Sequence, residues 1–479
     1  MTFVTPDMSA ATPELFLLAA TCVVLVTDVY LPERLRELTY HLAQASLVVT
    51  AILCLVLFPD SPQVSFSGNF VSDTLSTLLK AFILLTTYFV FFYSKIYLRE
   101  RNLFKGEYFV LGLFAVLGMM VLVSAHSLLT VYLGLELLSL SLYAMVAMNR
   151  ESKTASEAAM KYFVLGALAS GMLLYGMSMI YGATGTLDLS AIREHVTTLE
   201  SRNLILILGL VFVIVGIAFK LGAVPFHMWV PDVYEGAPTS VTLFIGSAPK
   251  IAAFGMLVRL LVDGLPGLHG DWTSMLVILS VLSMGVGNII AIAQANLKRM
   301  LAYSTIAHVG FLFLGIVAGS TAGYSASMFY IIVYAFMSLG AFAMIVLLGD
   351  AGFEADRIDD FKGLNDRNPW YALLMLIVMM SMAGVPPFIG FWAKWSVLRE
   401  VVAADMVWLA VVAIIFSIIG VFYYLRVVRM MYFEKPQATV PVAAGPEMRI
   451  MVSANALAIL ALGVYPSGLL ALCVTAFSG

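Results

Sequence analysis

Five lysines lie inside long apolar segments of the sequence, where a positive charge is costly. They are Lys80, Lys161, Lys220, Lys250 and Lys394. A charged side chain at the centre of a bilayer costs at least about 2.5–3.5 kcal/mol. Several such residues in one chain therefore predict a hydrated interior that serves a purpose. Burial disfavours the charged form of a lysine and a nearby carboxylate favours it, so such groups can take up and release protons.

The most informative acidic residue is Glu136, about ten residues into the fifth expected helix. Three polar side chains share its face at helical spacing: Tyr132, Ser139 and Tyr143. Lys220 lies near the end of the seventh expected helix. We expect Glu136 and Lys220 to form a pair that stores a proton, and the alternative is a buried pair with a structural role only.

Lys250 is expected near the middle of the eighth helix, and Lys394 follows the Gly384–Pro387 motif in the twelfth. Both are too deep for their ammonium groups to reach the membrane surface comfortably. His308 lies in the tenth expected helix beside a serine and a threonine. Because the unperturbed pKa of histidine is about 6.5, His308 is a candidate proton relay. A packed core histidine explains the same pattern equally well.

Lys161 and Lys80 fit simpler explanations. Lys161 lies one turn after Glu157 near the cytoplasmic end of the sixth helix, which is typical of an interfacial ion pair. Lys80 lies near the other end of the third helix, and we expect it to snorkel to the membrane surface. Asp232 and Glu235 fall in the connector after the seventh helix, where they either guard an entrance or are simply solvated.

The elements that carry these residues are membrane spans. The chain is 61% hydrophobic and 11% charged, with a mean hydropathy of +0.97, whereas ordinary soluble domains are about 45–50% apolar and about 25% charged. We therefore predict an all-α polytopic membrane protein, with one membrane domain over residues 1–479. About fourteen helices are expected, over residues 13–31, 39–58, 74–94, 107–125, 127–148, 157–182, 203–224, 238–262, 273–293, 299–318, 325–349, 370–402, 406–431 and 449–474.

A short motif occurs twice. Gly222–Phe226 in the seventh helix is echoed by Gly384–Phe388 in the twelfth, and an aromatic cluster follows each copy. The two copies are five helices apart, so they enter the membrane from opposite sides. This placement predicts inverted repeats whose seventh and twelfth helices are interrupted, with the freed backbone groups lining a polar interior. We expect the first repeat over residues 107–262 and the second over residues 273–431.

Basic residues gather in alternate connectors. Seventeen of them, Lys298 included, fall on one side of the predicted topology. The other side holds four: Arg193, Arg202, Arg259 and Arg399. Because basic loops stay cytoplasmic, both termini are expected on the periplasmic side, and an even number of spans agrees with this.

Several classes of function are excluded. The three cysteines, Cys22, Cys54 and Cys473, lie far apart, so an iron–sulfur or zinc site is not expected. The sequence contains no dinucleotide-binding fingerprint after a strand pattern and no Walker-type loop, which argues against nucleotide binding. A net charge of −3 argues against nucleic acid as a partner.

The run from Phe219 to Thr239 resembles the signature of the antiporter-like subunits of respiratory complex I. Its stretch Val233–Ala237 resembles one of these bacterial subunits in particular, and not its larger sister subunits. Further matches are Gly134–Glu136, Ser247–Phe254, Lys298–His308 and Gly384–Lys394. The resemblance therefore covers nearly the whole chain.

The resemblance implies roles for the candidate residues. In such subunits the glutamate that matches Glu136 pairs with the lysine that matches Lys220 in one half-channel, and the lysine that matches Lys161 modulates this pair. Two residues match the central polar axis: Lys250 and His308. Lys394 matches the terminal protonatable residue of the second half-channel.

The resemblance also implies partners and cofactors. We expect a proton-translocating subunit of an NADH:quinone oxidoreductase in a bacterial inner membrane, bound to the other membrane subunits of the complex. FMN, the iron–sulfur clusters and electron transfer from NADH to quinone are expected in partner subunits, with no redox cofactor in this chain. The alternative is a subunit of an Mrp-type cation/proton antiporter. A membrane scaffold with residual buried charges is a third possibility, and it predicts little effect from changing Glu136 or Lys220.

Overall fold

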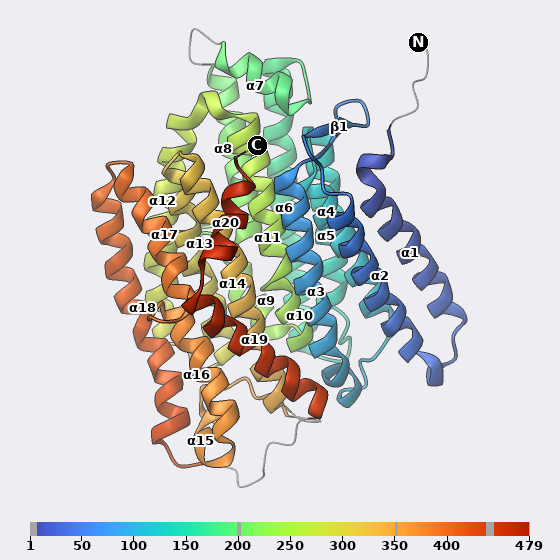
Figure 1. Ribbon diagram of the computed structural model, residues 1–479, viewed down its shortest axis with the longest axis vertical. Coiled ribbons are helices and arrows are strands. Elements are labelled where there is room, and N and C mark those ends of the chain that lie inside the picture. Colours follow the sequence, from blue (N-terminus) through green and yellow to red (C-terminus); the bar gives the residue numbers. More distant parts are fainter. Residues whose placement is uncertain (1–6, 199–202, 350–352, 437–444, 479) are drawn as a thin grey trace.

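The computed structural model describes residues 7–198, 203–349, 353–436 and 445–478, and these residues are mostly helical. In this part of the chain, thirteen helical segments are long and apolar enough to cross a membrane. One more apolar helix, α16 (Pro369–Ala383), is continued after a break by α17 (Ile389–Ala403). Figure 1 shows that the chain begins and ends at the same end of the molecule. The predicted all-α membrane fold is confirmed.

The first six long helices are α1 (Thr12–Tyr30), α2 (Glu37–Val56), α3 (Thr74–Glu100), α4 (Gly106–Val123), α5 (Leu128–Val146) and α6 (Lys153–Thr184). The later ones are α8 (Leu204–Leu221), α12 (His269–Ile292), α13 (Leu297–Val317), α14 (Thr321–Leu348), α18 (Val407–Phe433) and α19 (Pro446–Val464). Shorter elements are α7 (Leu189–Thr197), α9 (Trp229–Gly236), α15 (Leu364–Arg367), α20 (Ser467–Thr475) and the antiparallel pair β1 (Gln63–Ser65) and β2 (Phe70–Ser72).

The seventh and twelfth spans are interrupted, as the repeated motif predicts. Helix α8 ends before Gly222 and α16 ends before Gly384. These two glycines have φ angles of +82° and +83°, a left-handed conformation that glycine adopts without the steric cost of a Cβ atom. The chain then turns and starts a second helix, α9 or α17, so each span consists of two pieces.

The span expected over residues 238–262 is present as Thr239–Gly264, but it is not one regular helix. The structure divides this span into α10 (Thr239–Ile245), α11 (Ala248–Leu257) and the π-helical turn η3 (Val258–Gly264). Ser247 leaves the helical conformation, with φ −123° and ψ −95°. The following Pro249 lies in the first turn of α11, where its missing N–H removes no helical hydrogen bond.

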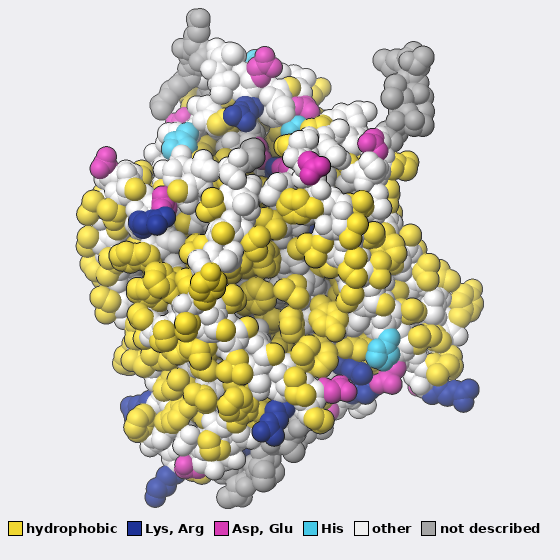
Figure 2. All heavy atoms as spheres, in the orientation of Figure 1, with side chains coloured by type: hydrophobic (Ala, Val, Ile, Leu, Met, Phe, Trp, Pro, Cys, Tyr) yellow, Lys and Arg dark blue, Asp and Glu magenta, His cyan; other side chains and the backbone are white. Residues whose placement is uncertain are grey.

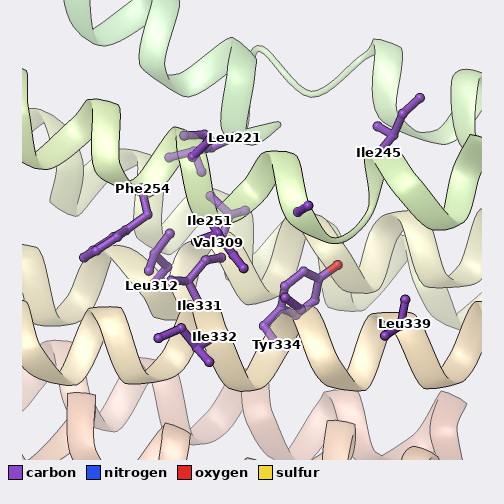
Figure 3. Packing of buried hydrophobic residues seen from close by; sticks show 14 of the residues in the cluster. Leu221, Ile245, Ile251, Phe254, Val309, Leu312, Ile331, Ile332, Tyr334 and Leu339 are labelled. Atoms are coloured by element: carbon purple, nitrogen blue, oxygen red, sulfur yellow. The ribbon is translucent and has the colours of Figure 1, made fainter. Parts of the chain in front are cut away.

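The interrupted eighth span and α13 form the centre of the molecule. In the most apolar window of the eighth span every residue is buried, whereas only a third are buried in the corresponding windows of α18 and α19. Figure 3 shows apolar side chains of α11, α13 and α14 interleaved around this centre. On the face seen in Figure 2, apolar side chains form a belt across the middle, and charged side chains lie mostly towards the two ends. Such a belt is the surface that a bilayer requires.

Candidate functional site

Two buried lysines meet at the end of α8: one belongs to this helix, and the other reaches it from α11. Lys220 is 8% exposed, and its Nζ donates a hydrogen bond of 2.9 Å to Ser139 Oγ of α5. Lys250, in the first turn of α11, is 1% exposed, and its Nζ donates a bond of 2.7 Å to the carbonyl oxygen of Leu221. Leu221 is the last residue of α8, so its carbonyl has no partner within the helix. The ammonium of Lys250 therefore caps the broken helix.

Other polar groups of the first break are also bound internally. The indole Nε1 of Trp229 donates to the carbonyl oxygen of Phe219 at 2.9 Å, and the N–H of Val224 donates to Ser283 Oγ at 2.9 Å. The ring of Trp229 lies 5.3 Å from the Nζ of Lys250. Since lipid offers no hydrogen bonds, a broken helix requires such internal partners.

Glu136 and Lys220 lie on adjoining elements without direct contact. Among the ion pairs of the described residues, none joins these two side chains, although their charges are close enough to interact. Ser139, the partner of Lys220, lies one turn after Glu136 on α5. Ser139 and Lys220 line a cavity of about 10 Å³, about the smallest volume that holds one water molecule. Among the described residues, Glu136 Oε1 is buried and has no hydrogen-bond partner.

The second break repeats the arrangement of the first. Lys394 of α17 is 9% exposed, and its Nζ donates hydrogen bonds of 2.9 Å to the carbonyl oxygen of Ala383 and to Ser417 Oγ. Ala383 is the last residue of α16. The Nζ of Lys394 also lies 5.1 Å from the ring centre of Phe311. A buried lysine therefore binds a free helix-end carbonyl at both interruptions.

His308 lies among tyrosines in the buried middle of α13. Its Nδ1 is 2.7 Å from the hydroxyl of Tyr330, and its Nε2 is 3.1 Å from the hydroxyl of Tyr424. The Tyr424 hydroxyl lies 2.5 Å from Ser304 Oγ. Because a hydroxyl can both donate and accept a hydrogen bond, a proton can be transferred along a chain of such side chains. Lys394 is close enough to His308 for their charges to interact.

Sequence reasoning missed Tyr330 and Tyr424, because tyrosines in apolar helices look like ordinary core residues. A signal was nevertheless present. A tyrosine buried in a span needs a hydrogen-bond partner for its hydroxyl. Helix α14, which carries Tyr330, packs against the helix of His308, and Tyr424 reaches His308 from α18 through its hydroxyl.

Lys161 belongs to a charged cluster at the end where the basic connectors gather. Its Nζ lies 2.9 Å from Glu157 and 2.8 Å from Asp232. Arg299 binds Asp232 and Glu235, each at 2.8 Å. Burial alone would raise the pKa of Asp232, but the bonds from Lys161 and Arg299 outweigh it and lower that pKa. Asp232 and Glu235, predicted in a connector, thus lie on the short helix α9 and are bound rather than simply solvated.

Two lysines lie in places that the sequence did not indicate. The prediction that Lys80 snorkels is wrong, since it is 2% exposed and its Nζ lies 2.6 Å from Glu14. Lys298, counted with the connectors, lies in the first turn of α13 and is also 2% exposed. Its Nζ donates a bond of 2.7 Å to the carbonyl oxygen of Ala237. Arg202, used in the topology prediction, lies outside the described residues.

Within the described residues, no group of three or more His, Cys, Asp or Glu side chains could hold a metal ion.

The chain matches a family model described as the transmembrane part of NADH:quinone oxidoreductase and Mrp antiporter subunits, over residues 125–420. It is 56% identical to NADH-quinone oxidoreductase subunit N of Thioalkalivibrio sulfidiphilus, with all of both chains covered. It is 58% identical to the subunit N of Thiobacillus denitrificans, with 98% of this chain and 97% of the relative covered.

Solved structures show the same fold. A chain of respiratory complex I from Thermus thermophilus is 31% identical with a TM-score of 0.82, and the match covers 96% of this chain and 99% of that one. A chain of the Mrp complex from Dietzia is 21% identical with a TM-score of 0.86, covering 98% and 97%, and shares the fold. The form of Val233–Ala237 in the sequence predicts subunit N rather than a larger sister subunit, and the names of the relatives agree with it. The chain therefore belongs to the subunit N family of NADH-quinone oxidoreductase, within the antiporter-like membrane subunits.

Proposed function

We propose that this chain is a proton-translocating membrane subunit of a bacterial NADH:quinone oxidoreductase. Electron transfer from NADH to quinone takes place in other subunits and drives proton movement through this one. The observation that carries the proposal is the pair of lysines that cap the two broken helices, Lys250 at Leu221 and Lys394 at Ala383. Buried lysines on free helix ends place titratable charge where lipid would otherwise forbid it.

The candidate residues take the following roles. Glu136 and Lys220 load a proton in the first half of the chain, with Ser139 between them. Two residues carry it through the centre: Lys250 and His308. Lys394 releases it in the second half. Lys161 modulates the first pair from the charged cluster with Asp232. Changes of charge in neighbouring subunits alter the protonation of Lys220 and Lys394 and so set the direction of transfer.

The inverted repeats, over residues 107–262 and 273–431, form the two halves of the proton path. This division is supported by the two equivalent breaks, each with a left-handed glycine and a lysine on the preceding carbonyl. The subunit lies in the bacterial inner membrane with both termini periplasmic, in line with the seventeen basic residues assigned to the opposite side. It binds the other membrane subunits, and FMN and iron–sulfur clusters reside in partner subunits.

An Mrp-type cation/proton antiporter subunit is the weaker reading. The Mrp chain resembles this one in fold at 21% identity, whereas relatives named subunit N are 52–58% identical over nearly full length. Isolation of the chain with its native partners separates the two. Co-isolation of subunits that carry flavin and iron–sulfur clusters supports the pump, and isolation with cation/proton antiporter subunits alone overturns it.

The substitution Lys220→Ala tests the mechanism. We expect the complex to assemble while proton pumping in proteoliposomes, measured against NADH oxidation, falls several-fold. Lys105→Ala, which removes an exposed connector lysine, is the matched control and should pump normally. An unchanged proton-to-electron ratio and rate in Lys220→Ala would contradict the proposal.

A further inference from the structure

Glu14 and Lys80 form a second glutamate–lysine pair, separate from the residues proposed above for proton transfer. The Nζ of Lys80 in α3 is 2.6 Å from Glu14 Oε1 in α1, and the two side chains are 2% and 6% exposed. Apart from this ion pair, neither oxygen of Glu14 has a hydrogen-bond partner among the described residues. A buried ion pair with so little support contributes little to stability, because the cost of desolvation offsets the attraction. Apolar residues of similar volume would hold the helices together as well.

A cavity of about 230 Å³ is lined in part by Lys80, the partner of Glu14, whereas Glu14 itself does not line it. Its buried wall is formed by Cys54, Ser72, Thr77 and Lys80, and its rim includes the exposed side chains of Ser9, Asp60 and Gln63. Hydroxyl, amide and carboxylate groups of this kind bind water, and the volume exceeds that of several water molecules. Water in the cavity would connect Lys80 to the β1–β2 end of the molecule, where both termini lie (Figure 1).

The helix that carries Lys80 also packs against the helix that carries Lys250. Helix α3 packs against α11, and Asp73, the N-cap of α3, binds Arg259 of η3 at 2.7 Å. Lys80 is seven residues along α3 from this contact and Lys250 is nine residues along α11. At 1.5 Å per residue these separations are about 10 Å and about 13 Å along the helices. Lys80 and Lys250 are thus at similar depths on neighbouring helices.

We propose that Glu14 and Lys80 form a further proton-exchange site, which connects the buried lysines Lys220, Lys250 and Lys394 to water at the β1–β2 end. The inference rests on the proposed function of the chain. In the loaded state Lys80, which lines the cavity, passes a proton to Glu14 and is reprotonated by a hydronium ion in the cavity, which leaves as water; Glu14 thus gains an O–H bond and Lys80 remains a cation. Release of that proton to water restores the ion pair. The other titratable or charged groups of the elements around the pair at this end are Asp7, Cys54, Asp60, Asp73, His126 and Arg259.

Water access is tested on Cys54, which shares the cavity with Lys80. In the assembled complex, Cys22 and Cys473 are replaced by serine so that Cys54 is the one cysteine of this chain. A small charged methanethiosulfonate reagent is added to sealed vesicles of known orientation, and the mass of this chain is followed. We expect modification from the β1–β2 side and not from the other. No modification of Cys54 from that side, while a Gln63→Cys variant at the rim reacts, would overturn the proposal.

Proton exchange is tested by Glu14→Gln, a neutral variant of nearly the same shape, and by the apolar double variant Glu14→Leu/Lys80→Met. Both variants should assemble, and proton pumping should fall several-fold in each. In Glu14→Gln the pH dependence of pumping should also shift, whereas it would stay unchanged if the pair were purely structural. Lys220→Ala is measured in parallel. If Lys220→Ala is impaired and both pair variants pump with the wild-type rate and pH profile, this inference alone fails. If all three variants pump normally, the proposed function fails with it.

Discussion

The Nζ of Lys394 donates a hydrogen bond of 2.9 Å to the carbonyl oxygen of Ala383, the residue at which α16 ends. Lys250 makes the equivalent bond, of 2.7 Å, to Leu221 at the end of α8. The free carbonyls and the dipole of a helix C-terminus favour a positive charge. Loss of a proton from either lysine removes that charge. The protonation state of each lysine is therefore coupled to the geometry of a broken helix.

We expect Lys394→Met to separate charge from packing at the second break. Methionine fills much of the volume of the lysine stem, so the complex should assemble, but the Ala383 carbonyl loses its cation. Proton pumping in proteoliposomes should fall several-fold relative to NADH oxidation. Lys435→Met, at an exposed position after α18, is the control. Wild-type pumping in Lys394→Met would show that this lysine carries no proton.

Gly384→Ala should disturb the same contact from the backbone side. Gly384 has φ +83°, and a Cβ atom there would lie 2.8 Å from Cδ of Lys394. The left-handed conformation alone costs a non-glycine residue about 1–2 kcal/mol. We expect a lower midpoint of thermal unfolding together with slower pumping. Gly171→Ala on α6, where a Cβ would meet nothing within 4 Å, should leave both unchanged. Equal behaviour of the two variants would argue against a special role for the break.

Tyr424→Phe removes one hydroxyl from the group around His308. The ring and its packing remain, but both the bond to His308 Nε2 and the contact with Ser304 are lost. We expect normal assembly with a lower maximal rate of pumping. Tyr175→Phe, on the exposed face of α6, tests the effect of losing a hydroxyl elsewhere. If the Tyr424 variant matches that control, the transfer path does not pass through this hydroxyl.

Asp232→Asn should change the pH dependence of stability. Because the bonds from Lys161 and Arg299 lower the pKa of Asp232, its ionised form stabilises the fold at neutral pH, and this contribution is lost as the pH falls through the lowered pKa. The unfolding temperature of Asp232→Asn should therefore lie below that of the wild type at neutral pH and approach it in acid. Glu151→Gln, at an exposed connector position, is the control. A difference that grows in acid would contradict the assignment.

The spans and the two interrupted helices could be predicted because their signals are local. A run of about 20 apolar residues is sufficient to indicate a span, and glycine followed by proline indicates a break. Lys220, Lys250, His308 and Lys394 could be singled out for a similar reason, since a charge or an imidazole in an apolar run is unusual whatever it contacts.

The contacts between distant helices could not be predicted. Nothing in the sequence around Lys80 points to Glu14, which precedes it by more than sixty residues, and a lysine near a helix end looks like one that snorkels. The bond from Lys250 to Leu221 depends on the break at Ser247, which was not predicted although Gly246 and Pro249 repeat the spacing of Gly222 and Pro225. Pairings of this kind follow from the packing of whole helices.

Proton transfer among these buried groups requires water between them, and a map of the assembled complex at a resolution that shows ordered water tests this most directly. We expect water molecules to join four side chains into one hydrogen-bonded line: Lys220, Lys250, His308 and Lys394. A well-ordered interior in which these side chains are separated by dry apolar packing, with no water between them, would contradict the account.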